Sequence, residues 1–301
     1  MNLTHTCLEC LYKQIHNFLH TSADSRTFQT HTRDEILRHT KDLLHSLEQS
    51  LHNTTLTPPK AAIAIYKNLS KALQNQDPYK HIKQQSIESA ATILATLKDH
   101  KAYAETLSDC IKVAVLGNVI DYGSQSSFSF ESSFDFGGLE FARFDIEAFE
   151  MRLCNAKNLL YIADNAGENL FDIVLLQFLK NHYPNLYITY LVRGAPIIND
   201  VTLVDLAHPL CAEIYHLCDV KSSHMESPGF IYDDAPKEIK DSFDNADVIV
   251  AKGMGNYECL ESIHKENLFL LFKVKCSVVA AHSGFELGKM VFLHNKGEAY
   301  A

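Results

Sequence analysis

Two oxygen-bearing side chains stand together in the segment YIADNAGE, Tyr161–Glu168. An apolar run typical of a buried strand ends here in Asp164 and Asn165, and Gly167 allows a tight turn into a following helix. Carboxylate and amide oxygens are the ligands that hard cations such as Mg²⁺ or Mn²⁺ take. The beginning of a helix also presents free N–H groups to an anion. The pair could therefore bind a metal ion, or either side chain could simply cap the helix.

The polar residues that follow other predicted strands favour the metal-binding interpretation. The segment RGAPIINDVT, Arg193–Thr202, places Asp200 at a predicted helix start, as another cap or as a third oxygen ligand. The segment KGMGNYE, Lys252–Glu258, combines two glycines with a lysine, an asparagine and a glutamate, which suits close backbone approach to an anion. The last clear strand carries Lys273 and Lys275 on one face of its end, as two point charges for a phosphoryl group.

A fifth polar segment lies upstream of the first strand. GNVIDYG, Gly117–Gly123, places Asn118 and Asp121 between glycines where the helical spacing ends. Each of the five segments alone is weak evidence, but five independent helix caps are a poor explanation for all of them. Ligands of parallel sheets bind outside the carboxyl ends of the strands, so we expect these segments to converge at that edge.

Two periodicities divide the chain into the elements that must position these residues. Apolar residues recur three and four positions apart from Cys7 to about Leu116, which predicts an all-helical bundle or cap. The later part contains apolar runs that predict strands, namely Leu159–Ala163, Leu186–Val192, Ala212–Leu217, Val248–Lys252, Leu268–Val274 and Met290–Leu293. Helical spacing between the runs predicts a parallel sheet covered on both faces. We therefore predict a helical domain over 1–120 and an α/β domain over 121–301.

Composition restricts the class of partner. The 301 residues carry a formal net charge of −10 and no basic stripe, which argues against nucleic acid but not against a small phosphorylated ligand. No apolar run reaches the roughly 18–20 residues that span a membrane, and no signal-peptide pattern is visible. Eight scattered cysteines do not indicate a secreted disulfide scaffold. We expect a cytoplasmic protein with no membrane partner.

The ordered set of segments resembles the metal-dependent damage-control phosphatases, also known as domain of unknown function 89. It is most similar to the prokaryotic branch with an N-terminal Cys-x-x-Cys. The shared segments are, in chain order, CLEC, GNVIDYG, ADNAGE, RGAPIINDVT, AKGMGNYE and FKVKC, so the likeness covers nearly the whole chain. It implies a helical N-terminal part, a Rossmann-like three-layer α/β/α core with a mostly parallel sheet, and one divalent metal ion.

The resemblance also implies roles for individual residues. The implied metal ligands are Asp164, Asn165 and Asp200. The implied lining of the same pocket is Asn118, Asp121 and Lys273. As a hypothesis, Mn²⁺, Mg²⁺, Co²⁺ or Ni²⁺ would polarise a phosphoryl group of a small phosphometabolite for attack by water. Lys273 and backbone N–H groups near Gly253 and Gly255 would offset the charge on the phosphoryl oxygens.

The general base stays open among Asp121, Glu168 and Glu258. An aspartyl-phosphate on Asp164 is an alternative, but direct attack by water is favoured because the same carboxylate is expected to be a ligand. The remaining candidates for substrate binding are Asn118, Gly253, Gly255, Asn256, Glu258, Lys273 and Lys275.

Two other functions stay open. A protein-carboxylate methyltransferase would need an S-adenosylmethionine pocket, which a glycine-rich loop after the first strand usually marks, and ADNAGE offers one glycine there. A non-enzymatic metal-binding regulator would use Cys7 and Cys10. A zinc site on this pair needs two further ligands, such as Cys276 and a histidine, and ordinary thiols are the simpler interpretation.

Overall fold

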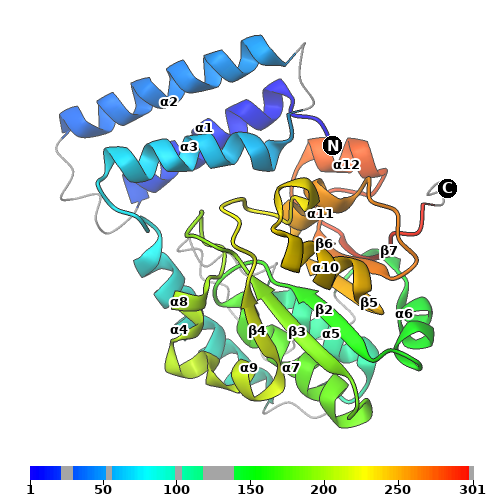
Figure 1. The fold of residues 1–301 in the computed structure, drawn as a ribbon. Coiled ribbons are helices and arrows are strands. Elements are labelled where there is room, and N and C mark those ends of the chain that lie inside the picture. The colour runs from blue at the N-terminus through cyan, green and yellow to red at the C-terminus, as the bar shows by residue number, and fades with distance from the viewer. Residues whose placement is uncertain (22–29, 52–55, 99–103, 118–138, 298–301) are drawn as a thin grey trace.

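A computed structural model describes residues 1–21, 30–51, 56–98, 104–117 and 139–297. Within these ranges the strands form one sheet in the order β1-β7-β6-β5-β2-β3-β4 (Figure 1). Their bounds are Phe141–Phe144 (β1), Asn158–Ile162 (β2), Tyr187–Val192 (β3), Asp219–Ser222 (β4), Val248–Lys252 (β5), Leu268–Lys273 (β6) and Met290–His294 (β7). The strands from β6 to β4 are parallel, whereas β7 is antiparallel to β6 and parallel to β1. The predicted α/β class with a mostly parallel sheet is confirmed.

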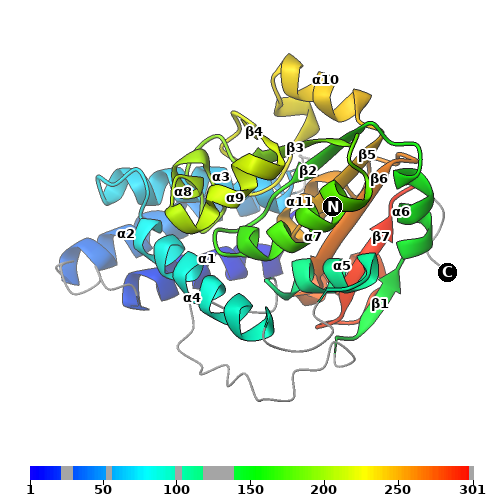
Figure 2. The same ribbon diagram turned by 90° about the horizontal axis from the view of Figure 1, so that it is seen from below.

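Helices cover both faces of the sheet, which explains why its central strands are apolar throughout. One face is covered by α5 (Leu107–Leu116), α6 (Ile146–Leu153) and α7 (Glu168–His182) (Figure 2). The other face is covered by α10 (Lys237–Asn245), α11 (Met254–Leu260) and α12 (Ser277–Ser283). All five residues of β5 are buried between these layers.

One predicted strand is wrong. The segment Ala212–Leu217 is the helix α9, in which only Ile214 is buried, and the strand β4 follows it. A short apolar run does not by itself distinguish a strand from a helix. The two outer strands, β1 and β4, have four residues each and mixed burial, so they lack the apolar signal of the central strands.

The first helices form a layer with its own apolar cluster, set apart from the sheet in Figure 1. They are α1 (His5–Thr21), α2 (Thr30–Ser50) and α3 (Pro58–Ala72). The next helix, α4 (Lys80–Lys98), connects this layer to the core. Tyr79 and Ile82 pack against the first cluster, whereas Ile87 and Leu94 belong to the cluster beneath the sheet. The predicted domain division at residue 120 stays a prediction.

A buried ion pair fastens α4 to the loop after β3. Lys83 Nζ lies 2.7 Å from Asp77 Oδ2 and 2.9 Å from Asp205 Oδ2, and the lysine side chain is fully buried. Asp205 is in the short helix α8 (Leu203–Leu206), whose capping box it forms with Thr202. The remaining short elements are the 3₁₀ helices Pro209–Cys211 and Tyr232–Asp234. The helical part thus directly supports the edge of the sheet where the polar segments lie.

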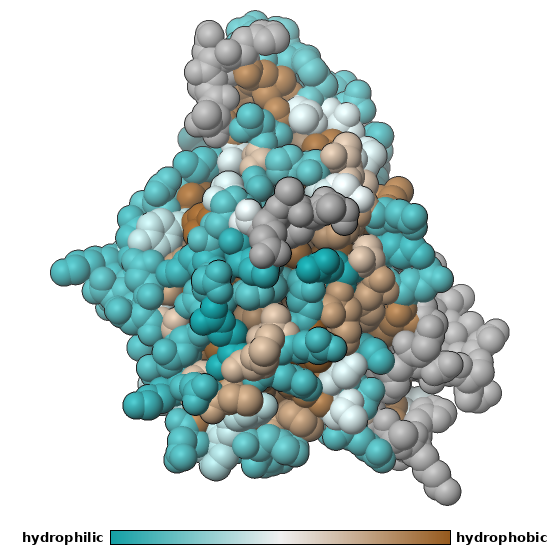
Figure 3. Space-filling model, turned by 90° about the vertical axis from the view of Figure 1, so that its right-hand side faces the viewer, coloured by the Kyte–Doolittle hydropathy of each residue, from teal (hydrophilic) through white to brown (hydrophobic). Residues whose placement is uncertain are grey.

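The surface in Figure 3 is mainly hydrophilic, with smaller hydrophobic areas between the polar residues. Among the described helices, none combines the length and the apolar character that crossing a membrane requires.

Candidate functional site

The loops after β2 and β3 are joined by backbone hydrogen bonds. Val201 N donates to Asp164 O over 2.9 Å, and Asn165 pairs with Asp200 in an isolated antiparallel bridge. Because β2 and β3 are adjacent and parallel, both loops leave the sheet at the same edge. The structure therefore brings together the three side chains that the sequence predicts as metal ligands.

None of these three side chains caps a helix. The N-cap of α7 is Gly167, with φ of 90° and no side-chain cap bond. The helix α8 begins after Thr202, not at Asp200, so the predicted helix start is wrong by three residues. Thr202 and Asp205 satisfy the first turn of α8 through a reciprocal capping box. The helix-cap alternative is therefore excluded for Asp164, Asn165 and Asp200.

Arg193 lies between the two aspartates. Its Nε donates to Asp200 Oδ2 over 2.6 Å, and its Nη1 donates to Asn256 Oδ1 over 3.3 Å. Its Nη2 lies 3.8 Å from Asp164 Oδ1 and makes no hydrogen bond within the described part of the chain, although this atom is buried. One guanidinium thus pairs with two carboxyl groups, and it donates a hydrogen bond to Asp200 but not to Asp164.

A second buried cation, Lys252, joins two carboxylates of α7. Its Nζ lies 2.7 Å from Asp172 Oδ1 and 3.2 Å from Glu168 Oε2. The hydroxyls of Tyr161 and Tyr190 each donate to Asp172 over 2.7 Å, and their rings stack at 5.3 Å. Burial by itself lowers the pKa of Lys252, but the Asp172 and Glu168 carboxylates outweigh it and raise that pKa. The lysine is therefore charged at neutral pH.

The Asn165 amide group has a fixed orientation. Its Nδ2 donates to Asp164 Oδ2 over 3.0 Å and to Glu168 Oε1 over 2.9 Å. The opposite orientation would place the amide carbonyl against two carboxylate oxygens, so the hydrogen bonds assign it. The carbonyl oxygen Oδ1 therefore faces away from both carboxylates and is available to a cation.

Negative charge exceeds positive charge in this buried region. The acidic cluster consists of Asp164, Glu168, Asp172 and Asp200, all buried, and the two buried cations that pair with it are Arg193 and Lys252. If all four carboxyl groups were ionised, the two cations would leave two negative charges without a partner charge. Burial, followed by the charges of Glu168 and Asp200, raises the pKa of Asp164 well above its usual range. Burial also raises the pKa of Asp200, although Arg193 opposes the shift.

These oxygens suit a divalent cation. The described residues hold no group of three or more His, Cys, Asp or Glu side chains arranged around a metal position. The predicted set differs from such a group because it has two carboxylates and one amide. Its donors are all oxygen atoms, which is the ligand type that hard divalent cations take.

Gly253 allows the end of β5 to approach Asp164. It has φ of 93°, and a Cβ there would lie 2.1 Å from Asp164 Oδ2. Its N–H donates to Leu271 O over 2.8 Å, so the residue provides space rather than a donor to an anion. Gly255, at the start of α11, likewise allows close packing, because a Cβ there would lie 2.0 Å from Pro228 O.

Asn256 supports the site from behind. Its Oδ1 accepts from Arg193 Nη1 and, over 2.8 Å, from Phe230 N. Its Nδ2 donates to Lys252 O over 2.6 Å and to Ala163 O over 3.2 Å. Both amide protons are therefore used inside the protein, and the predicted substrate-binding role of Asn256 stays a prediction.

The two predicted phosphoryl-binding lysines differ in position. Lys275 is exposed, and its charge acts on Asp164 by lowering its pKa against the effect of burial. Lys273 ends β6 and is partly buried, and burial together with Lys275 lowers its pKa. Of the two lysines, Lys275 is therefore the one whose charge lowers the pKa of Asp164.

The GNVIDYG segment is described only at its first residue. Asn118 and Asp121 lie outside the described residues. Gly117 packs directly on the site, since a Cβ there would lie 2.9 Å from Glu168 Cβ. The segment therefore begins beside the acidic cluster.

The cysteines remain free thiols. Cys7 is buried and Cys10 is exposed on α1. Partial burial of the Cys10 thiol raises its pKa, and the charges of Cys276 and Cys7 raise it further, although the hydrogen bond from Gln14 opposes the shift. The three thiols thus lie in one neighbourhood, but they are not arranged as a ready metal site.

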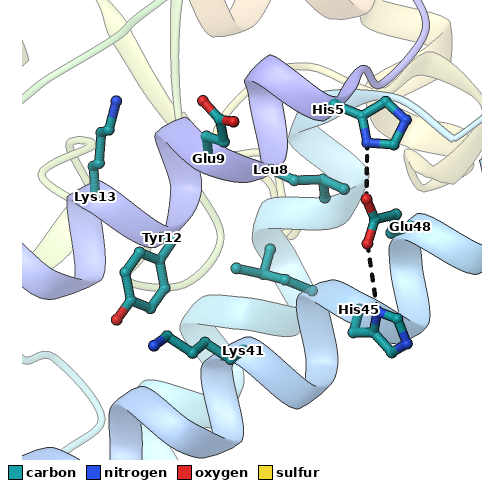
Figure 4. A pocket seen from close by; sticks show the side chains of 9 residues that line it. His5, Leu8, Glu9, Tyr12, Lys13, Lys41, His45 and Glu48 are labelled. Carbon is teal, nitrogen blue, oxygen red and sulfur yellow. Dashed lines mark hydrogen bonds and ion pairs between the residues drawn. The ribbon is translucent and has the colours of Figure 1, made fainter.

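A pocket of about 320 Å³ lies between α1 and α2, away from the predicted site residues (Figure 4). Glu48 connects the two helices there, with Oε1 2.9 Å from His5 Nδ1 and Oε2 3.4 Å from His45 Nδ1. None of its lining residues belongs to the predicted site.

Sequence reasoning gave none of Arg193, Lys252 and Asp172 a role in a buried ion pair, although it placed Lys252 in a loop that suits approach to an anion. Two of them had a signal. Lys252 ends a strand that is otherwise apolar, and Asp172 interrupts the apolar run of α7 four residues after Glu168, on the same helix face. A charge in such a position requires a buried partner.

Comparison with known proteins identifies the family. The family model described as the damage-control phosphatase ARMT1-like domain matches residues 3–291. This chain belongs to the damage-control phosphatase family. It is 30% identical to a damage-control phosphatase of Pyrococcus horikoshii, covering 98% of this chain and 99% of the relative. It is 29% identical to a damage-control phosphatase of Archaeoglobus fulgidus, covering 97% and 98%.

The family fold is also shared. A crystal structure of a Pyrococcus horikoshii protein of the domain-of-unknown-function-89 family matches with a TM-score of 0.82 and 28% identity. The match covers 98% of this damage-control phosphatase family member and all of the other chain. The resemblance inferred from the ordered segments is confirmed.

The Gly253→Ala change tests the contact between β5 and Asp164. We expect it to lower the free energy of unfolding by about 3 kcal/mol or more, because a clash adds to backbone strain. Gly288→Ala is the matched control, since Gly288 has φ of 88° and open space around a Cβ. Gly288→Ala should lower the free energy of unfolding only by the backbone strain, about 1–2 kcal/mol. If urea denaturation showed the same loss of stability for both variants, Gly253 would not be what allows β5 to approach Asp164.

Glu258 should make stability depend on pH. Burial raises the pKa of this partly buried carboxyl from 4.5 to about 7, although the Met1 ammonium opposes the shift. Between pH 4.5 and about 7 the folded chain then binds more protons at Glu258 than the unfolded chain does. The contribution of Glu258 to the free energy of unfolding therefore falls as the pH rises through this range. Glu258→Gln should stabilise the protein by about 1–2 kcal/mol at pH 8 and have little effect at pH 4.5.

Urea denaturation at both pH values checks this expectation. Glu266→Gln is the control, since Glu266 is exposed and pairs with Arg152. A Glu258→Gln protein less stable than the parent at pH 8 would contradict the raised pKa.

Proposed function

We propose that this chain is a divalent-metal-dependent phosphatase that hydrolyses small phosphorylated metabolites by direct attack of water. The observation that carries the proposal is the cluster of four buried carboxyl groups with only two buried cations paired to it, next to the Asn165 carbonyl; fully ionised, it would carry an excess of two negative charges. A single divalent ion matches that excess in charge and in ligand preference. The proposed ligands are Asp164, Asn165 and Asp200, and Mn²⁺, Mg²⁺, Co²⁺ or Ni²⁺ bound there would polarise a phosphoryl group and acidify a water molecule.

The names of the relatives support phosphatase chemistry. Both curated relatives described above are named damage-control phosphatases. Nothing in these comparisons favours the methyltransferase alternative or the metal-binding regulator.

The lysines at the end of β6 are proposed to bind the phosphoryl oxygens. Lys275 has the better position, because its charge reaches Asp164 and its side chain is exposed. Lys273 adds a second positive charge from the same strand end. Two point charges at this strand end can attract a phosphate ester to a region that the carboxylates would otherwise make repulsive.

The general-base candidates differ in how their carboxyl groups are engaged. Glu258 has a pKa raised to about 7 by burial, which suits proton transfer near neutral pH. Both oxygens of Glu168 have partners within the protein, Asn165 and Lys252. Asp121 stays a candidate outside the described residues.

The Asp164→Ala variant tests the proposed function. We expect metal-dependent hydrolysis of p-nitrophenyl phosphate to fall by at least about 100-fold, because the proposed site loses a ligand and a charge. The fold should persist, since the change removes a carboxylate whose burial is unfavourable. Asp219→Ala, at the partly exposed start of β4, is the control and should retain activity. Full metal-dependent turnover by a folded Asp164→Ala protein would reject the proposal.

A further inference from the structure

The Glu168 carboxylate lies between an amide and an ammonium group. Oε1 accepts from Asn165 Nδ2 over 2.9 Å, and Oε2 lies 3.2 Å from Lys252 Nζ. The side chain is buried, and Gly117 closes over its Cβ. This arrangement holds the carboxylate in one position.

The ammonium that holds Glu168 is itself immobile. Lys252 Nζ donates to Asp172 Oδ1 over 2.7 Å and to Glu168 O over 3.3 Å. The ion pair with Glu168 Oε2 adds a third contact to the same ammonium group. Lys252 is therefore held by partners within the protein.

The chain of contacts continues into the sheet. Asp172 is held by the hydroxyls of Tyr161 on β2 and Tyr190 on β3. Lys252 is the last residue of β5, which pairs with β2. The position of Glu168 is therefore set by three adjacent strands rather than by its own flexible side chain.

We propose that Lys252 and Glu168 are positioning residues that hold the Asn165 amide with its N–H protons on the carboxylates and its carbonyl oxygen toward the proposed metal ion. This inference rests on the proposed function and deepens it by assigning the support of one ligand. It also gives Glu168 a role other than general base. Partners that orient a metal ligand typically change metal affinity about 10- to 100-fold when they are removed.

Replacement of Lys252 distinguishes positioning from simple electrostatics. Removal of a buried cation makes the region more negative, so Coulomb attraction alone predicts tighter Mn²⁺ binding by a Lys252→Met variant. Loss of the Glu168 anchor frees the Asn165 amide to rotate, so positioning predicts weaker binding. The two explanations thus differ in the sign of the effect.

The experiment measures free Mn²⁺ by electron paramagnetic resonance during titration of the purified full chain. We expect Lys252→Met to weaken Mn²⁺ binding about 10- to 100-fold. Lys265→Met is the matched control, because Lys265 lies before the start of β6 and pairs with Asp244 at 3.3 Å. It should leave binding unchanged. Unchanged or tighter Mn²⁺ binding by a folded Lys252→Met protein would overturn the inference.

Glu168→Gln provides a second test that keeps the side-chain shape, in case Lys252→Met fails to fold. Positioning predicts Mn²⁺ binding weakened about 10- to 100-fold, with kcat at saturating Mn²⁺ within about tenfold of the parent. A general base predicts unchanged Mn²⁺ binding and a kcat lower by about 100-fold or more, which would overturn the inference.

The parent protein and Asp164→Ala separate this inference from the proposed function. If the parent does not bind Mn²⁺, or if Asp164→Ala binds it equally well, the metal site itself is wrong. If Asp164→Ala loses binding while Lys252→Met and Glu168→Gln keep it, only the positioning role is wrong.

Discussion

An excess of buried negative charge is the constraint on which the rest of this site depends. Isolated charges in a protein interior are very unfavourable unless they are paired, and the two cations Arg193 and Lys252 are shared among the four carboxyl groups of the acidic cluster. Protonation can relieve the imbalance, and the raised pKa of Asp164, caused first by burial and then by Glu168 and Asp200, shows that tendency. A divalent cation relieves it without a proton, and in the proposed function it also supplies the means to activate a phosphoryl group.

The fold can be understood as the framework that holds these charges together. Parallel strands β2, β3 and β5 end at one edge, so three loops meet there. Gly253 allows the segment after β5 to approach Asp164, and Asn256 joins Arg193 to the backbone behind the site. From outside the sheet, Lys83 on α4 fastens the helical part to the loop that carries Asp200. Each contact limits the freedom of the carboxylates to move apart.

Sequence predicted that the polar segments after β2 and β3 would converge, but it did not predict the ion pairs among them. Asp164, Asn165 and Asp200 could be found because they follow strands, and strand ends meet by topology. The pairing of Lys252 with Asp172, 80 positions apart, depends on the packing of α7 against β5, which no local spacing contains. The helix α9 was mistaken for a strand for a related reason. Its six residues are too few for periodicity to decide, and tertiary contacts determined the outcome.

Anomalous scattering from a crystal grown with Mn²⁺ tests the central claim most directly. The account predicts one strong peak within about 2.0–2.5 Å of oxygen atoms from Asp164, Asn165 and Asp200, at the edge of the sheet where β2 and β3 end. A peak elsewhere in the molecule, or no peak at an Mn²⁺ concentration that supports turnover, would contradict the claim that these buried carboxylates are balanced by a divalent cation.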